Sequence, residues 1–70
     1  MTVYKIRNTK TGLYSGGGKY RQPYNKNGKI WLTWANLQSH IDKFVKGIDP
    51  NIDDLEIVEY DMKETNIISI

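Results

Sequence analysis

Residues 34–46 repeat apolar side chains at the spacing of an α-helix, and this pattern limits the possible folds of the chain more than any other. The apolar side chains fall on one side of a spiral and the polar ones fall opposite, which predicts an amphipathic helix. Its apolar positions are Trp34, Leu37, Ile41, Phe44 and Val45. Thr33 suits the N-cap, and Gly47 suits the C-terminal end. An apolar stripe must be covered by a second layer, so the fold needs a sheet against this helix.

The first strands of that sheet are predicted close to the start of the chain. Val3–Arg7 alternates, which places Tyr4 and Ile6 on a face directed toward the core. The opposite, outer face would carry Val3, Lys5 and Arg7. Turn-forming residues at 8–12 then return the chain, so Leu13–Ser15 is predicted as the second strand of a hairpin.

A third strand is predicted just before the helix. Residues 19–24 are interpreted as a loop, because Pro23 cannot occupy a central strand position. Asn25–Gly28 ends in the Asn-Gly pair that favours a tight turn. Lys29–Leu32 follows it as the predicted third strand, which completes an antiparallel meander.

The part of the chain after the helix adds to the same sheet. Leu55–Tyr60 is rich in β-branched and aromatic residues, as strands are. Residues 61–66 are expected to turn the chain, and Ile67–Ile70 to add a short last strand. The sequence therefore predicts an α+β fold: an antiparallel sheet of three to five strands, with one amphipathic helix packed on one face and the helix preceding the fourth strand.

Seventy residues without cysteine indicate a single small α+β domain over residues 1–70. The absence of cysteine excludes a disulfide framework, thiolate zinc sites and a cysteine nucleophile. No apolar run approaches the roughly 20 residues that span a bilayer. The first residues lack the apolar core of a secretory signal. We expect a cytoplasmic protein without membrane contact, for which self-association is open.

Charge is divided sharply between the two parts of the chain. Residues 1–41 carry seven Lys and Arg and no Asp or Glu, whereas residues 42–70 carry all eight acids and three Lys. The basic part also holds both Trp and four of the five Tyr. Cations combined with flat rings are typical of a binding surface for phosphates, bases or acidic proteins.

The predicted binding surface is the hairpin with its glycine run. Gly16–Gly18, beside Ser15 and Lys19, has the ingredients of an anion cradle, but the spacing is not that of a P-loop. The candidate binding residues are Lys10, Tyr14, Gly16, Gly17, Gly18, Lys19, Tyr20, Arg21, Tyr24, Lys26 and Lys29. Tyr14, Tyr20 and Tyr24 are expected to be the exposed rings because they lie beside turns.

Two classes of ligand fit such a surface. A protein partner would be bound stoichiometrically through aromatic anchors and charge. Nucleic acid or a small phosphorylated nucleotide would instead meet the glycine loop with its phosphate and stack its base on a tyrosine. The sequence favours a protein partner. Binding of nucleic acid or of a small phosphorylated nucleotide remains the alternative.

Enzymatic and metal-dependent functions are not expected. His40 is the only histidine and lies at the border of the apolar helix stripe, without a second metal ligand at suitable spacing. The acidic residues around Asp49–Asp54 do not fit a calcium loop, because Asp54 stands where the turn glycine belongs and Tyr60 where the bidentate Glu belongs. We therefore expect no catalytic residue, no metal and no cofactor.

One pattern resembles a known class of proteins. Lys10–Gly18, with the sequence KTGLYSGGG, is followed by Gly28–Trp31 and then by Leu37 and His40 on the predicted helix. This combination is similar to small bacteriophage accessory proteins. Members of that class with known roles commonly bind and block host machinery or counter host defences. The resemblance implies a non-enzymatic binding protein made in an infected bacterial cell, and it implies no catalytic residues.

Overall fold

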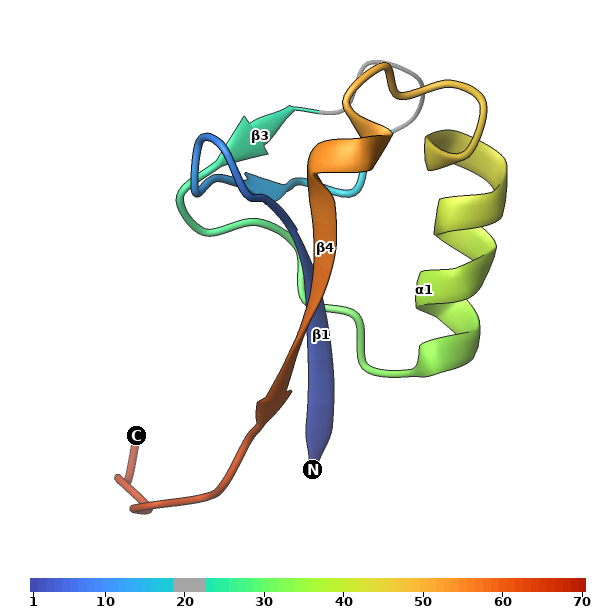
Figure 1. The fold of residues 1–70 in the computed structure, drawn as a ribbon. Coiled ribbons are helices and arrows are strands. Elements are labelled where there is room, and N and C mark those ends of the chain that lie inside the picture. Colours follow the sequence, from blue (N-terminus) through green and yellow to red (C-terminus); the bar gives the residue numbers. More distant parts are fainter. Residues whose placement is uncertain (19–22) are drawn as a thin grey trace.

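The computed structural model, which describes residues 1–18 and 23–70, confirms the α+β class (Figure 1). Its strands form one antiparallel sheet in the order β3-β2-β1-β4. They are β1 (Thr2–Asn8), β2 (Tyr14–Ser15), β3 (Tyr24–Asn25) and β4 (Leu55–Asp61). Helix α1 (Trp34–His40) continues into a π-helical turn (Ile41–Val45), and a 3₁₀ turn (Ile52–Asp54) precedes β4. None of the helices in the described ranges is long and apolar enough to cross a membrane.

The pairing of β1 with β4 is the main connection in the sheet. It runs over seven residue pairs, from Thr2 opposite Asp61 to Asn8 opposite Leu55. The pairing of β1 with β2 is far shorter and joins Arg7 to Tyr14. The two long strands are thus the frame of the fold, although they lie at opposite ends of the sequence.

The predicted third strand is wrong in its position. Lys29–Leu32 forms no strand: Lys29 N donates to Ser15 O at 2.8 Å, whereas Trp31 makes an isolated bridge to Tyr4. Lys29 bonds to β2 and Trp31 bonds to β1. Because the partner strand changes within three residues, the segment forms no regular ladder. The third strand is β3, which lies partly in the segment interpreted as a loop.

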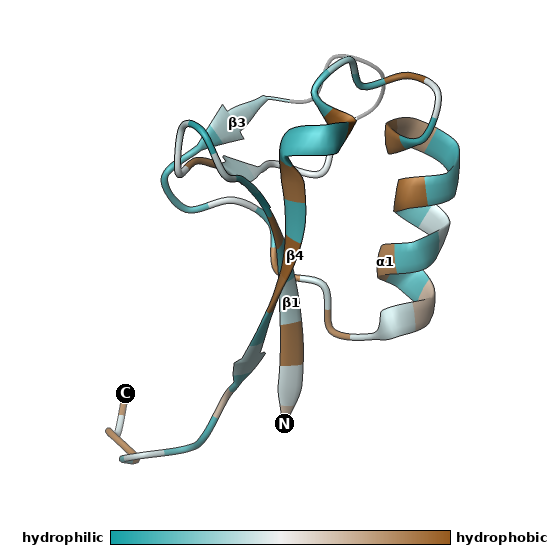
Figure 2. Ribbon diagram, viewed as in Figure 1, coloured by the Kyte–Doolittle hydropathy of each residue, from teal (hydrophilic) through white to brown (hydrophobic). Residues whose placement is uncertain are grey.

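The helix is confirmed, with its predicted cap. Thr33 is extended, and its hydroxyl accepts a hydrogen bond from Asn36 N at 3.2 Å. Leu37 and Val45 pack against Ile6 and Trp31 to form the core, and apolar bands of the helix face the sheet in Figure 2. Trp34 departs from the predicted stripe: its side chain is 51% exposed and contacts the Tyr4 ring edge-on at the start of α1.

The outer face of β1 is more covered than the sequence predicted. Val3, expected to face outward with the charged residues, is buried. It lies opposite Tyr60 of β4, and Ile30 and Met62 line the same hollow. Pairing with a distant strand therefore covers a residue that the alternation alone left exposed.

The predicted last strand is absent. Residues 62–70 have no regular secondary structure, and the side chains of Ile67, Ile68 and Ile70 are exposed. Figure 1 shows this segment leaving the sheet beyond the end of β4 and bending only at its tip, away from the sheet. The expected turn at 61–66 does not form, so these residues have no neighbouring strand to pair with.

Removing the helix cap gives a first testable prediction. Thr33→Ala leaves the amide of Asn36 without its acceptor, and we expect a loss of about 1 kcal/mol in the free energy of unfolding. Urea denaturation followed by circular dichroism measures this loss. The control is Glu64→Ala at an exposed position beyond β4, which should be neutral. Equal effects of the two variants would contradict the role of the cap.

Candidate functional site

A pocket of about 450 Å³ lies between helix α1 and the segment that leads into it. The wall on the sheet side comes from Gly17 and from residues 29–32, and the wall on the helix side comes from α1 and the π-helical turn. Its lining residues are Gly17, Lys29, Ile30, Trp31, Leu32, Asn36, Ser39, His40, Lys43 and Phe44. A cavity of this size is in the range of small-molecule sites.

The helix contributes a stripe of polar side chains to the pocket. Asn36, Ser39, His40 and Lys43 follow the spacing of one helix face, and all four line the pocket. Asp42 points elsewhere, because its carboxylate pairs with Lys46 at 3.3 Å and accepts a hydrogen bond from Gln38. The acidic residue of the helix is therefore held outside the pocket.

The opposite wall is built around Gly17 and Lys29. Gly17 has φ +76°, and its amide donates to Ser15 Oγ at 3.1 Å. A Cβ at this position would collide with the Lys29 side chain, so only glycine allows the lysine to lie there. Lys29 Nζ lies 5.3 Å from the centroid of the Trp31 ring. The glycine loop thus positions a cation over an aromatic ring at the pocket wall.

His40 is the most unusual residue of the pocket. It is 8% exposed, and its ring lies 5.0 Å from that of Trp31 and 5.5 Å from that of Phe44. Its Nε2 is buried and has no hydrogen-bond partner among residues 1–18 and 23–70. A buried polar atom without a partner costs about 1–3 kcal/mol. A ligand that bonds to this nitrogen would remove that cost.

Burial lowers the pKa of His40, and the positive charge of Lys29 lowers it further. The folded protein therefore binds this proton more weakly than the unfolded chain, whose histidine titrates near pH 6.5. We expect the free energy of unfolding to be constant above that pH and to fall as the pH drops below it. Urea titrations at several pH values between 5 and 8 measure this slope, and the His40→Gln variant should lose it. A wild-type slope that persists in the variant would contradict the assignment.

The electrostatic character of the pocket is positive. Lys29 and Lys43 contribute two cations, and no carboxylate is found among the described residues that line it. Asn36 and Ser39 add groups that can donate hydrogen bonds. An anionic group with several oxygen acceptors is the chemical complement of this set.

Two of the predicted binding residues, Gly17 and Lys29, lie in the pocket. Gly16 supports the same loop, since its amide donates to Pro23 O at 2.8 Å, and Gly18 follows directly in the sequence. Lys19, Tyr20 and Arg21 lie outside the described residues. The glycine run therefore contributes to the site through its backbone.

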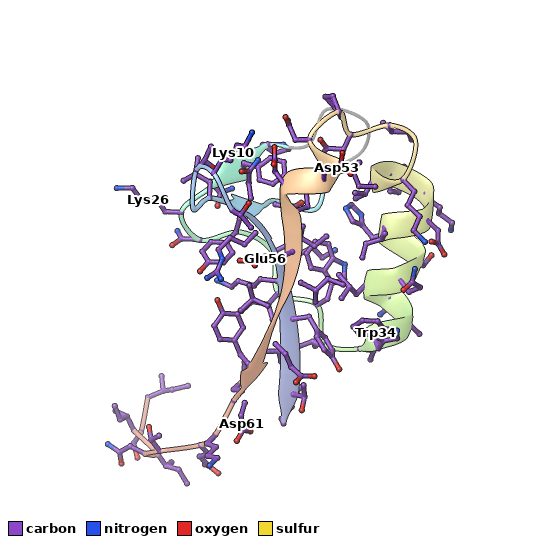
Figure 3. All side chains as sticks on the ribbon, viewed as in Figure 1. Lys10, Lys26, Trp34, Asp53, Glu56 and Asp61 are labelled. Atoms are coloured by element: carbon purple, nitrogen blue, oxygen red, sulfur yellow. The ribbon has the colours of Figure 1, made fainter. Side chains whose placement is uncertain are left out.

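The other predicted residues lie away from the pocket. Lys10 pairs with Asp54 at 3.5 Å, and Lys26 is exposed; Figure 3 shows both on the hairpin side of the molecule. The Tyr24 hydroxyl donates to Asp49 Oδ2 at 3.0 Å, and burial together with this carboxylate raises the pKa of Tyr24. Tyr14 is half-buried on the outer face of the sheet. Tyr14 and Tyr24 are thus half-buried, and the hydroxyl of each bonds to another element of the fold.

Tyr14 belongs to a second polar cluster, on the face opposite the helix. Its hydroxyl accepts a hydrogen bond from the Tyr60 hydroxyl at 3.2 Å, and Lys5 Nζ lies 4.7 Å from its ring centroid. Arg7 pairs with Glu56 across the strands. The hydrogen bonds from Tyr60 and Arg7 lower the pKa of Tyr14. These contacts fasten β2 and β4 to β1, and we assign them a structural role.

Sequence reasoning missed most of the helix wall of the pocket. Asn36, Ser39 and Lys43 are not among the predicted binding residues, and His40 was expected only at the border of the apolar helix stripe. One signal was present: the residues that carry the resemblance to phage proteins include Lys29, Trp31 and His40. All three line this pocket, together with Gly17 from the hairpin part of the pattern.

Two further observations limit the chemistry of the site. The described residues contain no group of three or more His, Cys, Asp or Glu that could hold a metal ion. Comparisons with protein-family models, with curated proteins and with solved structures find no match to this chain. The pocket itself is therefore the feature that indicates the function.

Proposed function

We propose that this chain is a non-enzymatic binding protein whose pocket takes a small phosphorylated ligand of the nucleotide class. The observation that carries the proposal is the buried Nε2 of His40, which has no hydrogen-bond partner in the described part of the chain and lies in a pocket with two lysines and no carboxylate in its described lining. A phosphate brings negative charge and several acceptor oxygens to such a site.

The pocket lining holds groups that suit each of the two parts of such a ligand. Lys29 and Lys43 would neutralise the phosphate, and Ser39 with Asn36 would bond its oxygens. Ile30, Leu32 and Phe44 offer apolar surface to a planar base or another apolar group. His40 would then bond the part of the ligand that enters deepest.

The hypothesis that this chain binds a host macromolecule stays a prediction. It was based on one continuous hairpin surface, but Lys10, Tyr14 and Tyr24 are engaged in contacts on different elements. A phage-type accessory role is compatible with the pocket, since stoichiometric binding would withdraw a phosphorylated ligand from the host. The pocket favours the small ligand over a macromolecular partner.

Calorimetric titration with a panel of nucleoside monophosphates, the matching nucleosides and inorganic phosphate tests the proposal. We expect nucleotides to bind more tightly than nucleosides and to raise the melting temperature by mass action. Lys43→Glu should weaken nucleotide binding by roughly tenfold or more, which corresponds to about 1.4 kcal/mol. Lys46→Glu is the matched control, because Lys46 pairs with Asp42 away from the pocket, and it should bind normally. Equal binding of nucleosides and nucleotides would sink the proposal.

The His40 ring gives an independent readout in NMR spectra. A bound phosphate close to the imidazole should raise the pKa of His40 from its lowered value, since an anion favours the charged ring. A titration curve of the ring protons that is unchanged by saturating nucleotide would place the ligand elsewhere.

A further inference from the structure

Strand β4 leaves one long edge of the sheet open in the part of the chain that the structure describes. It is the last strand of the order β3-β2-β1-β4. The hydrogen bonds at its two ends, Met62 N to Met1 O and Thr9 N to Asp54 O, fix which residues bond to β1. With antiparallel alternation, Ile57, Glu59 and Asp61 direct their backbone groups to the open side. Open edges of this kind accept a further strand.

The chain also carries a strand-forming segment without a partner strand. Residues 65–70 have the sequence TNIISI, which is rich in β-branched residues and uncharged at every side chain. Ile67 and Ile68 are 80% and 82% exposed. The sequence predicted a strand here and the single chain does not form one, so its strand preference is unsatisfied.

The segment is poorly suited to fold back onto its own β4. The turn formers Asp61 and Asn66 are separated by residues 62–65, which contain none of the Gly, Pro, Asn or Asp that tight turns prefer, and the turn expected at 61–66 does not form. In Figure 1 the chain continues outward beyond the end of β4. An extended continuation of this kind would place the tail along the β4 edge of a second molecule related by a two-fold axis.

We propose that two copies of this protein dimerise by exchanging these tails, each adding residues 65–70 as an antiparallel strand to the open β4 edge of the other. The register that fits places Ile68 opposite Ile57, with Ile70 opposite Leu55 and Ile67 opposite Val58. Ile57, 40% exposed on the helix face of the sheet, is then covered. Every isoleucine of the tail meets an apolar side chain in this register.

Direct pairing of two β4 edges is the less favourable arrangement. β4 carries Glu56, Glu59 and Asp61, so two such strands would bring six carboxylates together, and like charges across strands are destabilising. An uncharged tail adds no such repulsion. The exchange is also reciprocal, so it closes on itself as a dimer.

Sedimentation equilibrium of the full chain over a wide concentration range tests the proposal. The expected mass is twice the 8.1 kDa of one chain. Ile67→Asp with Ile68→Asp should give a monomer, and the same positions changed to Val should stay dimeric. Glu59→Pro removes one outward N–H without touching the bonds to β1 and should also give a monomer, whereas Glu59→Ala should not.

A mixture of the Ile67→Asp, Ile68→Asp variant with the Glu59→Pro variant distinguishes tail exchange from any other dimer contact. The tail variant keeps an intact edge and the Glu59→Pro variant keeps an intact tail, so together they should form a heterodimer through one tail and one edge. A monomeric wild-type chain overturns the proposal. So does a dimer that survives the aspartate substitutions, which would indicate edge-to-edge pairing, or an open polymer in place of a dimer.

Discussion

Leu37→Ala is expected to lower the free energy of unfolding by about 2–5 kcal/mol. Leu37 is 0% exposed and packs with Ile6, Trp31 and Val45 in the only hydrophobic core found among the described residues. A domain of this size has a total stability of roughly 4–10 kcal/mol, from about 0.05–0.15 kcal/mol per residue. The variant should therefore lose roughly half of the stability of the domain.

Urea denaturation followed by tryptophan fluorescence measures this effect, because Trp31 lies in the same cluster. Leu32→Ala is the matched control: the same chemical change falls on a residue that is 56% exposed, and we expect a loss below about 1 kcal/mol. If Leu37→Ala were as stable as Leu32→Ala, the helix could not be packed on the sheet as described.

Gly28→Ala is the second substitution with a large expected effect. Gly28 has φ +68°, and an added Cβ would collide with the side chain of Tyr14 and lie 3.1 Å from Ser15 O. Left-handed backbone strain costs about 1–2 kcal/mol for a residue with a Cβ, and overpacking adds about 1–3 kcal/mol. We expect a total loss of about 2–5 kcal/mol in the free energy of unfolding.

The Gly12→Ala variant is the control that separates the cost of backbone strain from the cost of the collision at Gly28. Gly12 has nearly the same φ, +73°, but a Cβ there meets nothing within 4 Å, so only the strain of about 1–2 kcal/mol applies. Parallel denaturation curves of the two variants give the difference. A similar loss at both positions would show that the turn at Gly28 is not pressed against Tyr14. Because Gly28 precedes Lys29, its substitution should also weaken nucleotide binding.

The candidate site shows how a domain of this size can hold a pocket. Its core is small, yet a pocket remains between helix α1 and the irregular segment at residues 29–32. That segment leaves the regular ladder after the tight turn at Gly28 and bonds to two strands in succession. The irregular backbone brings Lys29 and Trp31 to face the polar stripe of the helix.

Local features of the sequence determined the helix, its Thr33 cap, the alternation of β1 and the turn at Gly28. Each depends on residues a few positions apart, whose propensities and hydrogen bonds act without the rest of the fold. The polar stripe of α1 was also readable from spacing alone. The spacing did not indicate which residues lie opposite this stripe in the folded chain.

Tertiary structure alone decided which of these residues are buried and which meet. The β1–β4 pairing joins residues up to 59 positions apart; it buries Val3, which alternation placed outside. Trp31 entered the core while Trp34 stayed half exposed, although both are tryptophans flanking the same turn into the helix. His40 is buried because Trp31 and Phe44 pack around it, and its Nε2 has no hydrogen-bond partner among residues 1–18 and 23–70. Burial depends on contacts between distant segments, which no local pattern specifies.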